Sequence, residues 1–458
     1  MAEKLWGGAF SVPPDEEIIR YTSSLSVDSR LALYDIAGSC AHVRMLAECG
    51  IIRKEEAEEI VAGLTQIGED LKNGTVKLDP AAEDVHSAIE VLLIERVGDA
   101  GKAVHAARSR NDQVATDVRL YVRDGIDKLG SSIRGLQRVI ALAADANIDA
   151  IMPGYTHMRH GQPVLFAHHL LAYVEMLERD RERLGDCRKR VNVLPLGSGA
   201  VGGTSLPIDR TYTAELLGFE GVASNSIDAV SDRDFVMEVL SAIAILFIHI
   251  SRLCEELILW STKEFGFIAF DESLCTGSSM MPQKVNPDGL ELARGKSGAA
   301  FGSLIAMMST MKSLPLSYNR DMQEDKRPLF EAFDAVLHTV DIVAKYVGGM
   351  SVDAEALLRA LDGDFSEATD IAEYLVEKGE RFRDAHRIVG ELTRHCRDGD
   401  KTYGDLTPDE WRNFSSLFGD DVAALVGPEK SVERKVSQGS TSPGLVKKEI
   451  AAWLEKLK

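Results

Sequence analysis

Two long runs of apolar residues at helical spacing are the feature that most constrains the fold of this chain. In the first run, apolar side chains recur every three or four residues, at Val118, Val122, Ile126, Leu129, Ile133, Leu136 and Ile140. The second run has the same spacing, at Val236, Val239, Ile243, Leu246, Ile250, Leu253 and Leu257. Such spacing places the apolar side chains on one face of a helix. We expect long helices in a bundle, and because stripes of this length usually exceed what one chain can cover, we expect an oligomer.

Shorter helical patterns flank these runs. They predict helices over 31–46, 54–71, 81–97, 166–192, 287–312 and 327–347, and then small amphipathic helices as far as the C-terminus. Alternating patterns that predict β-strands do not extend over any length. The predicted fold class is therefore mainly α. Because 458 residues exceed one ordinary hydrophobic core, we expect an N-terminal helical domain (1–106), a central long-helix bundle (107–355) and a small C-terminal helical domain (356–458).

The composition excludes several classes of protein. Hydrophobic residues make up 45% and charged residues 27% of the chain, as in an ordinary globular protein. The net charge of −20 argues against general nucleic-acid binding and against docking on anionic membranes. The longest apolar stretch, 239–250, is too short to span a bilayer, and the N-terminus has no apolar signal core. The six cysteines show neither metal-ligand spacing nor a disulfide framework, so we expect a cytoplasmic protein.

One polar loop, 277–287, carries the most distinctive chemistry. It reads Gly-Ser-Ser-Met-Met-Pro-Gln-Lys-Val-Asn-Pro, and its prolines are expected to forbid both regular pairing and a continuous helix. Asn286 is predicted to be the N-cap of the next helix, with Pro287 at its first position. A helix N-terminus favours bound negative charge, and Lys284 adds a positive charge beside it. The loop is therefore a candidate anion site that holds a serine, Ser278, able to be deprotonated.

Further polar strings lie at other predicted helix ends, where loops can converge on a pocket. They are 84–86 together with 108–113, then 155–163, and finally 318–326. They supply a general acid/base candidate, His157, with several cations and neutral hydrogen-bond donors. The sequence shows no metal constellation and no nucleotide-binding fingerprint. Such an inventory suits proton abstraction next to a carboxylate, with fixed donors stabilising the negative charge that develops.

Several of these segments resemble the motifs of a known family. The loop resembles the signature of the fumarase/aspartase superfamily, Gly-Ser-Ser-x-Met-Pro-x-Lys-x-Asn-Pro, and matches every fixed position. Other segments resemble the argininosuccinate lyase family in particular. They are Leu-Trp-Gly-Gly at 5–8, Ser-Arg-Asn-Asp-Gln at 109–113, Gly-Tyr-Thr-His at 154–157, Asp-Ala-Val-Ser-Asp-Arg-Asp-Phe at 228–235 and Tyr-Asn-Arg-Asp-Met-Gln-Glu-Asp-Lys at 318–326. The resemblance covers essentially the whole chain.

The resemblance implies a reaction and a set of roles. The reaction would be reversible β-elimination of argininosuccinate to arginine and fumarate through a carbanion, the last step of arginine biosynthesis, with no cofactor and no metal. Ser278 would abstract the succinyl proton, and Lys284 and Asn286 would hold the anionic intermediate. His157 would protonate the departing guanidino nitrogen, with Glu291 orienting and charging it.

The resemblance also implies a set of substrate-binding positions and an assembly. The positions are Ser24, Asp28, Asp84, His86, Ser109, Arg110, Asn111, Thr156, Tyr318, Gln323 and Lys326. A substrate with three carboxylates and a guanidinium needs such a mixture of cations, amides and acids. The family fold is a three-domain, mainly helical chain. Its homotetramer joins the long helices into one bundle, and each active site is built from loops of three subunits.

The chain departs from the family pattern at a few positions. Ala9, Ala106 and Val285 replace the common arginine, threonine and second lysine, and 158–161 reads Met-Arg-His-Gly in place of Leu-Gln-Arg-Ala. Two alternatives stay open: a sister lyase that eliminates ammonia, water or an adenylate-linked amine from a succinyl group, and a non-enzymatic role. The strings at 109–113 and 318–326 favour the argininosuccinate branch, and the intact catalytic candidates weigh against a structural role.

Overall fold

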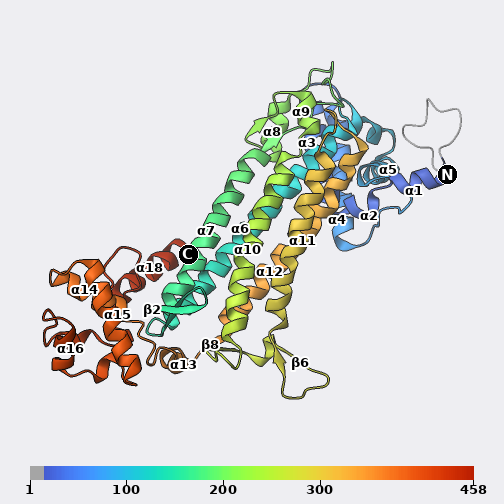
Figure 1. The fold of residues 1–458 in the computed structure, drawn as a ribbon. Helices are drawn as coiled ribbons and strands as arrows, with labels where there is room; N and C mark the ends of the chain where they lie inside the picture. The colour runs from blue at the N-terminus through green and yellow to red at the C-terminus, as the bar shows by residue number, and fades with distance from the viewer. Residues whose placement is uncertain (1–14) are drawn as a thin grey trace. The chain divides into compact units, whose positions relative to one another are not determined.

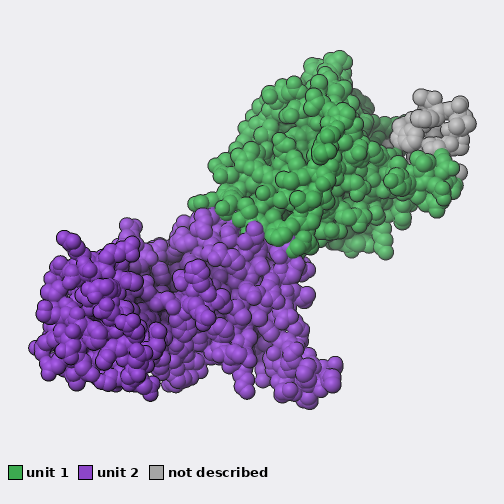
Figure 2. Space-filling model, viewed as in Figure 1, with its two compact units in different colours: residues 1–130, 182–245, 298–337 green, residues 131–181, 246–297, 338–458 purple. Residues whose placement is uncertain are grey.

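A computed structural model describes residues 15–458. The chain divides into two compact units of three segments each (Figure 2). Unit 1 comprises 1–130, 182–245 and 298–337, and unit 2 comprises 131–181, 246–297 and 338–458. The segments alternate because each of the long helices contributes residues to both units. The Leu-Trp-Gly-Gly string at 5–8 and the departure at Ala9 lie outside the described residues.

The long helices follow the sequence patterns closely (Figure 1). They are α6 (Arg110–Ala146), α7 (Phe166–Val191), α10 (Asp234–Trp260), α11 (Asp288–Met311) and α12 (Lys326–Gly348). The first apolar run lies on α6 and the second on α10, and every residue of both runs is at most 3% exposed. The prediction of a mainly α fold is therefore confirmed. The argument that these stripes exceed what one chain can cover is wrong, because helices of the same chain already bury them.

The N-terminal part of unit 1 consists of shorter helices. They are α1 (Glu16–Thr22), α2 (Leu25–Asp28), α3 (Ala32–Glu48), α4 (Lys54–Asn73) and α5 (Val85–Val97). Helix α5 begins four residues later than the predicted start at 81, because a capping box sets its first turn. The carboxylate of Asp84 accepts a hydrogen bond from the backbone N–H of Ser87 (2.7 Å), and the Ser87 hydroxyl accepts one from the backbone N–H of Asp84 (3.2 Å).

Short strands also occur, each in a two-stranded sheet. Strands β1 (Ile151–Thr156) and β2 (Arg159–Leu165) form an antiparallel hairpin over the segment that the sequence predicted to be irregular. Pro153 pairs with Pro163, and the register shifts between Pro153 and Tyr155, so the alternation that would identify two strands is interrupted. The other pairs are β3 (Val193–Leu194) with β4 (Gly221–Val222), β5 (Ile268–Phe270) with β8 (Met350–Val352), and β6 (Thr276–Gly277) with β7 (Val285–Asn286).

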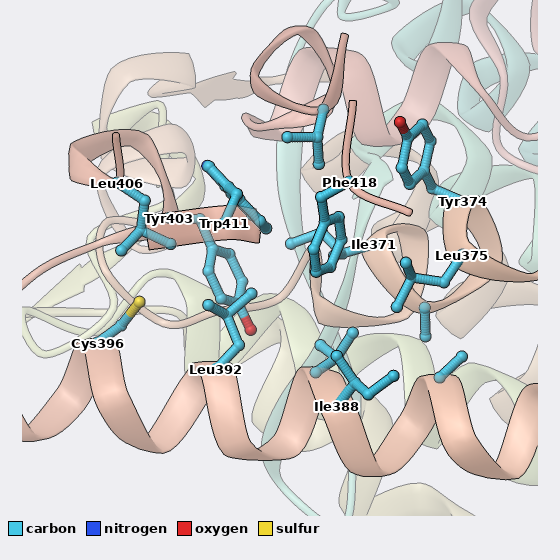
Figure 3. Packing of buried hydrophobic residues seen from close by; sticks show 14 residues of the cluster. Ile371, Tyr374, Leu375, Ile388, Leu392, Cys396, Tyr403, Leu406, Trp411 and Phe418 are labelled. Carbon is cyan, nitrogen blue, oxygen red and sulfur yellow. The ribbon is translucent and has the colours of Figure 1, made fainter. Parts of the chain in front are cut away.

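The remaining helices are short. They are α8 (Arg210–Leu217), α9 (Ser226–Ser231), α13 (Ala354–Arg359), α14 (Ala368–Glu377), α15 (Phe382–Asp398), α16 (Pro408–Phe414), α17 (Pro428–Glu433) and α18 (Pro443–Lys456). Helices α14 to α16 enclose a hydrophobic cluster of their own within unit 2. Figure 3 shows Ile388, Leu392 and Cys396, four residues apart on α15, facing the rings of Trp411 and Phe418. This packing holds the C-terminal helices together.

Helix α10 is long and strongly apolar. Among the described residues, it is the one helix whose length and composition would allow it to cross a membrane. The 239–250 stretch alone is too short, but the apolar pattern continues through the rest of the helix. The core helix of a globular protein meets the same criteria, and 56% of the most apolar 18-residue window of α10 is buried inside the structure.

Candidate active site

Unit 1 brings together the candidates from the N-terminal helices. The hydroxyl of Ser24 donates to the carboxylate of Asp28 (2.5 Å), and the other oxygen of that carboxylate accepts from the backbone N–H of Val85 (3.1 Å). Burial raises the pKa of Asp28, and the hydrogen bond from Ser24 and the charges of His86 and Lys326 oppose that rise. The end of α2 is thereby attached to the start of α5, where Asp84 and His86 lie.

Arg110, the first residue of α6, joins the start of α5. Its Nε lies 3.2 Å from Oδ2 of Asp84. Burial alone would raise the pKa of Asp84, but the nearby charges of His86 and Arg110, together with the hydrogen bonds of Ser87, outweigh burial and hold the pKa below its ordinary value. Asp84 is therefore a carboxylate at neutral pH. Arg110 also donates from Nη1 to Oε1 of Gln113 (2.9 Å), so its guanidinium is held from two sides.

The segment before α12 supplies a buried lysine. Lys326 is 2% exposed and donates to Oδ1 of Asp325 (2.6 Å), whose Oδ2 accepts from Nε of Arg233 (2.5 Å). Lys326 therefore belongs to a buried charge cluster, although it stands at the start of a helix, where a lysine is usually solvated. Burial raises the pKa of Tyr318, and the charge of Asp325 raises it further. Gln323 is half-buried in the same segment, in the 3₁₀ turn Arg320–Asp325.

The start of α6 is attached to a glycine-rich loop, 196–204. Asp112 is fully buried, and its carboxylate accepts from the backbone N–H groups of Ser109 (2.9 Å), Gly197 (3.0 Å) and Gly199 (2.7 Å). The side-chain amide of Asn111 donates to the carbonyl of Ala200 (3.2 Å). Burial raises the pKa of Asp112 to about 6. Ser109 and Asn111 are therefore fixed by backbone contacts at the N-terminus of a long helix.

In unit 2, His157 occupies the tip of the β1–β2 hairpin. Thr156 pairs with Arg159, so His157 and Met158 form a two-residue turn, and both are exposed. Both have positive φ angles, 54° and 56°, as a type I′ turn requires. Asparagine and glycine are the usual residues in such turns, so a histidine and a methionine are strained there. The paired strands β1 and β2 thus hold His157 and Thr156 at an exposed turn.

The 277–287 loop also lies in unit 2, and Figure 1 shows it extending beyond the helix ends near the β6 label. Its two ends pair as β6 and β7, which corrects the expectation that proline forbids regular pairing. The pairs are Thr276 with Asn286 and Gly277 with Val285, so neither proline is among them. Helix α11 begins at Asp288, and the carbonyl of Pro287 accepts from the N–H of Glu291 (3.3 Å). Pro287 therefore takes the N-cap position predicted for Asn286.

Ser278 is oriented by its own loop. Its Oγ accepts hydrogen bonds from the backbone N–H groups of Met280 (3.3 Å) and Met281 (3.0 Å). Donors of this kind favour the negatively charged form of the atom that accepts them. Lys284 is exposed, and its backbone N–H donates to the carbonyl of Met281 (3.0 Å). Glu291, in the first turn of α11, is exposed as well.

The predicted residues therefore form separate groups. Unit 1 holds Ser24, Asp28, Asp84, His86, Ser109, Arg110, Asn111, Tyr318, Gln323 and Lys326, and unit 2 holds Thr156, His157, Ser278, Lys284, Asn286 and Glu291. Within the described part of unit 2, no hydrogen bond or ion pair joins His157 to Ser278, Lys284 or Glu291. The histidine and these loop residues are therefore not joined by any hydrogen bond or ion pair within the described part of one chain.

Several polar residues beside these candidates were not singled out from the sequence. Asp35 on α3 and Asp117 on α6 are buried against His86, and Arg233 and Asp325 are both 0% exposed. For Asp35 and Asp117, the sequence signal is an acid within the apolar pattern of a predicted helix, whereas Arg233 and Asp325 lie outside the α-helices and give no such signal. Asp117, for example, directly precedes Val118 of the first apolar run. The string 228–235 contained Arg233, but only the fold pairs it with Asp325.

Comparisons with known proteins identify the family and the fold. A family model described as Lyase matches residues 8–302, and one described as Argininosuccinate lyase C-terminal matches residues 365–433. The second range includes the hydrophobic cluster of α14 to α16. Among solved structures, EDDS lyase in complex with formate has a TM-score of 0.83 and 28% sequence identity, covering 94% of this chain and 87% of that chain. Class II fumarase from Schistosoma mansoni, at 17% identity, has a TM-score of 0.75 over 93% of this chain and 94% of its own, which shows the shared fold.

Two relatives match over nearly their full lengths. The argininosuccinate lyase of Desulforudis audaxviator is 50% identical over 454 residues, which cover 99% of this chain and 99% of that protein. The argininosuccinate lyase of Geobacter sulfurreducens is 50% identical over 448 residues, which cover 98% of each chain. Identity at this level over both the bundle and the C-terminal helices shows that the chain belongs to the argininosuccinate lyase family, within the fumarase/aspartase superfamily.

Proposed function

We propose that this chain cleaves argininosuccinate reversibly to arginine and fumarate, with Ser278 as the base. The observation that carries the mechanism is the hydrogen bonding of Ser278, whose Oγ accepts from two backbone N–H groups. A serine hydroxyl is a weak base, and its alkoxide forms only where fixed donors and a cation stabilise it. Lys284, six residues further along the same loop, supplies that cation when the loop closes on substrate.

The reaction then proceeds by elimination. The Ser278 alkoxide takes a proton from the succinyl carbon next to a carboxylate, and the electron pair left on that carbon is delocalised into the carboxylate. Lys284 and Asn286 hold the resulting dianionic group, and removing one such donor typically costs about 3–4 kcal/mol of barrier. The electron pair then forms the carbon–carbon double bond of fumarate. The guanidino nitrogen leaves and takes a proton from His157, which Glu291 orients and charges.

Unit 1 provides the binding groups for a substrate of mixed charge. Arg110 and Lys326 are cations suited to carboxylates, and Asp28 and Asp84 are acids suited to a guanidinium or an ammonium group. Ser24, Ser109, Asn111, Tyr318 and Gln323 supply neutral hydrogen-bonding groups, His86 supplies ring nitrogens, and Thr156 supplies a hydroxyl from unit 2. Proton transfer and charge stabilisation come entirely from these side chains, so the proposed reaction takes no cofactor and no metal.

The separation of the candidate groups supports a shared site in a homotetramer. Within the described part of one chain, no hydrogen bond or ion pair joins His157 to Ser278, Lys284 or Glu291, and we infer that loops of three subunits complete each site. Helix α11 provides an uncovered apolar face for assembly: Phe301, Ile305 and Met308 recur at i, i+4 and i+7 and are 39%, 60% and 46% exposed. A Cβ added at Gly295, Gly298 or Gly302 of the same helix meets no described atom within 4 Å. A neighbouring helix can therefore approach closely.

Two further features belong to this proposal. We infer the family's three-domain division, 1–106, 107–355 and 356–458, in which the central domain contains the five long helices. We also infer a cytoplasmic location, where argininosuccinate is made and used in arginine biosynthesis. Both follow from family membership and from the sequence patterns.

A direct assay tests the proposal. The purified protein is mixed separately with argininosuccinate, adenylosuccinate, aspartate and malate, and fumarate is followed by its ultraviolet absorbance. We expect fumarate from argininosuccinate alone, with arginine released in equal amount. Fumarate from another of the four substrates would instead make this chain a sister lyase, and no fumarate from any would favour a non-enzymatic role.

A further inference from the structure

Three buried side chains from three helices of unit 1 meet near the start of α5. They are Asp35 of α3, His86 of α5 and Asp117 of α6, and each is at most 2% exposed. Nδ1 of His86 lies 3.0 Å from Oδ1 of Asp35 and 3.3 Å from Oδ2 of Asp117. One oxygen of each carboxyl group and one ring nitrogen of the histidine lie within 4.8 Å of one another.

The two carboxyl groups are not equivalent. Oδ1 of Asp35 accepts from the side-chain amide of Gln113 (2.5 Å) in addition to facing His86. Oδ2 of Asp117 makes no hydrogen bond with any described residue. Burial and mutual repulsion disfavour the ionisation of both carboxyl groups when they lie this close. Burial and the charge of Asp35 raise the pKa of Asp117 well above its ordinary value. Burial also acts on Asp35, but the hydrogen bond and charge of His86 outweigh it and lower the Asp35 pKa.

We propose that Asp35 and Asp117 share one proton, carried by Asp117, and that the single remaining charge on Asp35 positions His86 by accepting from its Nδ1–H. The O–H of Asp117 then donates to Asp35, and Oδ2 of Asp117, which accepts from no described donor, is free to carry that proton. The imidazole is held in one orientation, with Nδ1 as the donor to Asp35 and Nε2 as the ring atom left for other contacts. Asp35 and Asp117 are thus positioning residues, and their effect on turnover rests on the proposed place of His86 among the substrate-binding residues.

The neighbouring groups favour a proton over a metal cation in this cluster. The buried guanidinium of Arg108 donates from Nη1 to Oγ of Ser39 (2.8 Å), and its charge acts on both acids. A divalent cation would add to that positive charge in a site closed to water. Gln113 also connects the cluster to Arg110, because its Oε1 accepts from Nη1 of that arginine (2.9 Å). The charge on Asp35 therefore orients both His86 and Arg110.

The experiment compares Asp117→Asn with the double variant Asp35→Asn/Asp117→Asn in argininosuccinate cleavage. An amide at 117 can donate an N–H to Asp35 in place of the acid O–H, so we expect kcat/KM to fall only about threefold. The double variant has no carboxylate to accept from His86, and we expect kcat/KM to fall by on the order of 10–100-fold. This loss should appear mainly as a higher KM, because His86 is placed in substrate binding rather than proton transfer.

The single variant Asp35→Asn gives an internal check. With Asp35 neutral, Asp117 ionises and accepts from His86 itself. The decrease in kcat/KM of Asp35→Asn should therefore lie between the decreases of the other two variants. If Asp117→Asn lowered kcat/KM as much as the double variant, both acids would be ionised partners and the proposal would be overturned. Metal bound to the purified wild-type protein and lost in Asp117→Asn would overturn it as well.

Thermal unfolding tests the shared proton independently of the proposed function, because the measurement does not require catalytic turnover. If Asp117 is neutral in the folded protein, replacing it by asparagine removes no charge, and the unfolding midpoint should stay within about 2 °C of wild type. If Asp117 is instead an ionised partner of His86, the same variant should unfold several degrees lower, and the shared proton is disproved. A wild-type protein that failed to cleave argininosuccinate would refute the proposed function and leave this comparison valid.

Discussion

The guanidinium of Arg233 and the carboxylate of Asp325 form an ion pair closed to solvent on both sides, with Nε 2.5 Å from Oδ2 and both side chains 0% exposed. The other carboxylate oxygen accepts from Lys326 (2.6 Å). One buried acid therefore balances two cations that come from different parts of the chain. Replacing Asp325 by asparagine should leave the buried charge of Arg233 without an anionic partner. The free energy of unfolding, measured with denaturant, should fall by about 3–5 kcal/mol.

An exposed ion pair is the control for that measurement. Arg387 and Glu391 lie one turn apart on α15, with 60% and 44% of their side chains exposed. Glu391→Gln should change the unfolding free energy by less than about 1 kcal/mol. Equal effects from Asp325→Asn and Glu391→Gln would show that the buried pair does not stabilise the fold in the way described.

The two adjacent serines of the 277–287 loop should differ sharply in their contribution to catalysis. Ser278→Ala removes the proposed base, and kcat should fall by about 10²–10⁴-fold, while substrate binding measured by calorimetry and the assembly state are retained. Ser279→Ala is the matched control, since it removes a hydroxyl from the next residue of the same loop, and it should stay within a few-fold of wild type. Near-normal turnover by Ser278→Ala would refute the base assignment.

The uncovered face of α11 should hold the assembly together. Ile305→Glu places a charge in the centre of the stripe formed with Phe301 and Met308, so burial against a partner would carry a desolvation penalty. We expect size-exclusion chromatography with light scattering to show species smaller than the wild-type assembly. Val436, which is 88% exposed and lies between α17 and α18 in the sequence, provides the control: Val436→Glu should leave the assembly unchanged. A tetramer that persisted in Ile305→Glu would place the interface elsewhere.

Mixing two inactive variants tests whether sites are shared between subunits. His157→Asn and Ser278→Ala each lack one proposed catalytic group. If a site takes these groups from different chains, random mixed assemblies regain roughly a quarter of wild-type activity, because each required group is intact in half of the chains. The two proteins are combined after reversible dissociation and assayed for fumarate. Mixtures no more active than the separate variants would indicate that both groups act within one chain.

Glu178 gives a prediction of pH dependence in unit 2. Hydrogen bonds from Arg181 outweigh burial, and together with those from Gln137 and Lys456 they lower the pKa of Glu178 to about 2. A carboxyl group with a lowered folded pKa stabilises the fold above its unfolded pKa of 4.5, and this contribution is lost as pH falls from about 4.5 to 2. The shift corresponds to about 3 kcal/mol.

The measurement compares wild type with Glu178→Gln at several pH values. The variant should be less stable by up to about 3 kcal/mol at pH 7, and the difference should shrink as pH falls from 5 towards 3. Gln137 and the nearby cations are unchanged, so the comparison isolates the carboxylate. A difference that did not depend on pH would mean that Glu178 acts through packing rather than through its charge.

Much of the fold could be predicted because helix formation is governed by local periodicity. The apolar runs on α6 and α10 gave the positions of both helices, and the breaks between patterns separated the others within a few residues. The exceptions have local causes as well. The β1–β2 hairpin was missed because Pro153, Gly154 and Pro163 interrupt its alternation, and α5 starts late because Asp84 and Ser87 cap each other.

The sequence by itself determined the helical architecture and the chemistry of the 277–287 loop, because helical period and loop composition are properties of neighbouring residues. Only the tertiary structure decided which polar groups meet. It buried Lys326 beside Asp325 and Arg233, and it placed Asp35 and Asp117 around His86. It also covered the long apolar stripes within one chain and left a different face, on α11, exposed. These outcomes depend on which helix faces pack together, and that choice is made by long-range burial of apolar surface and pairing of buried charge.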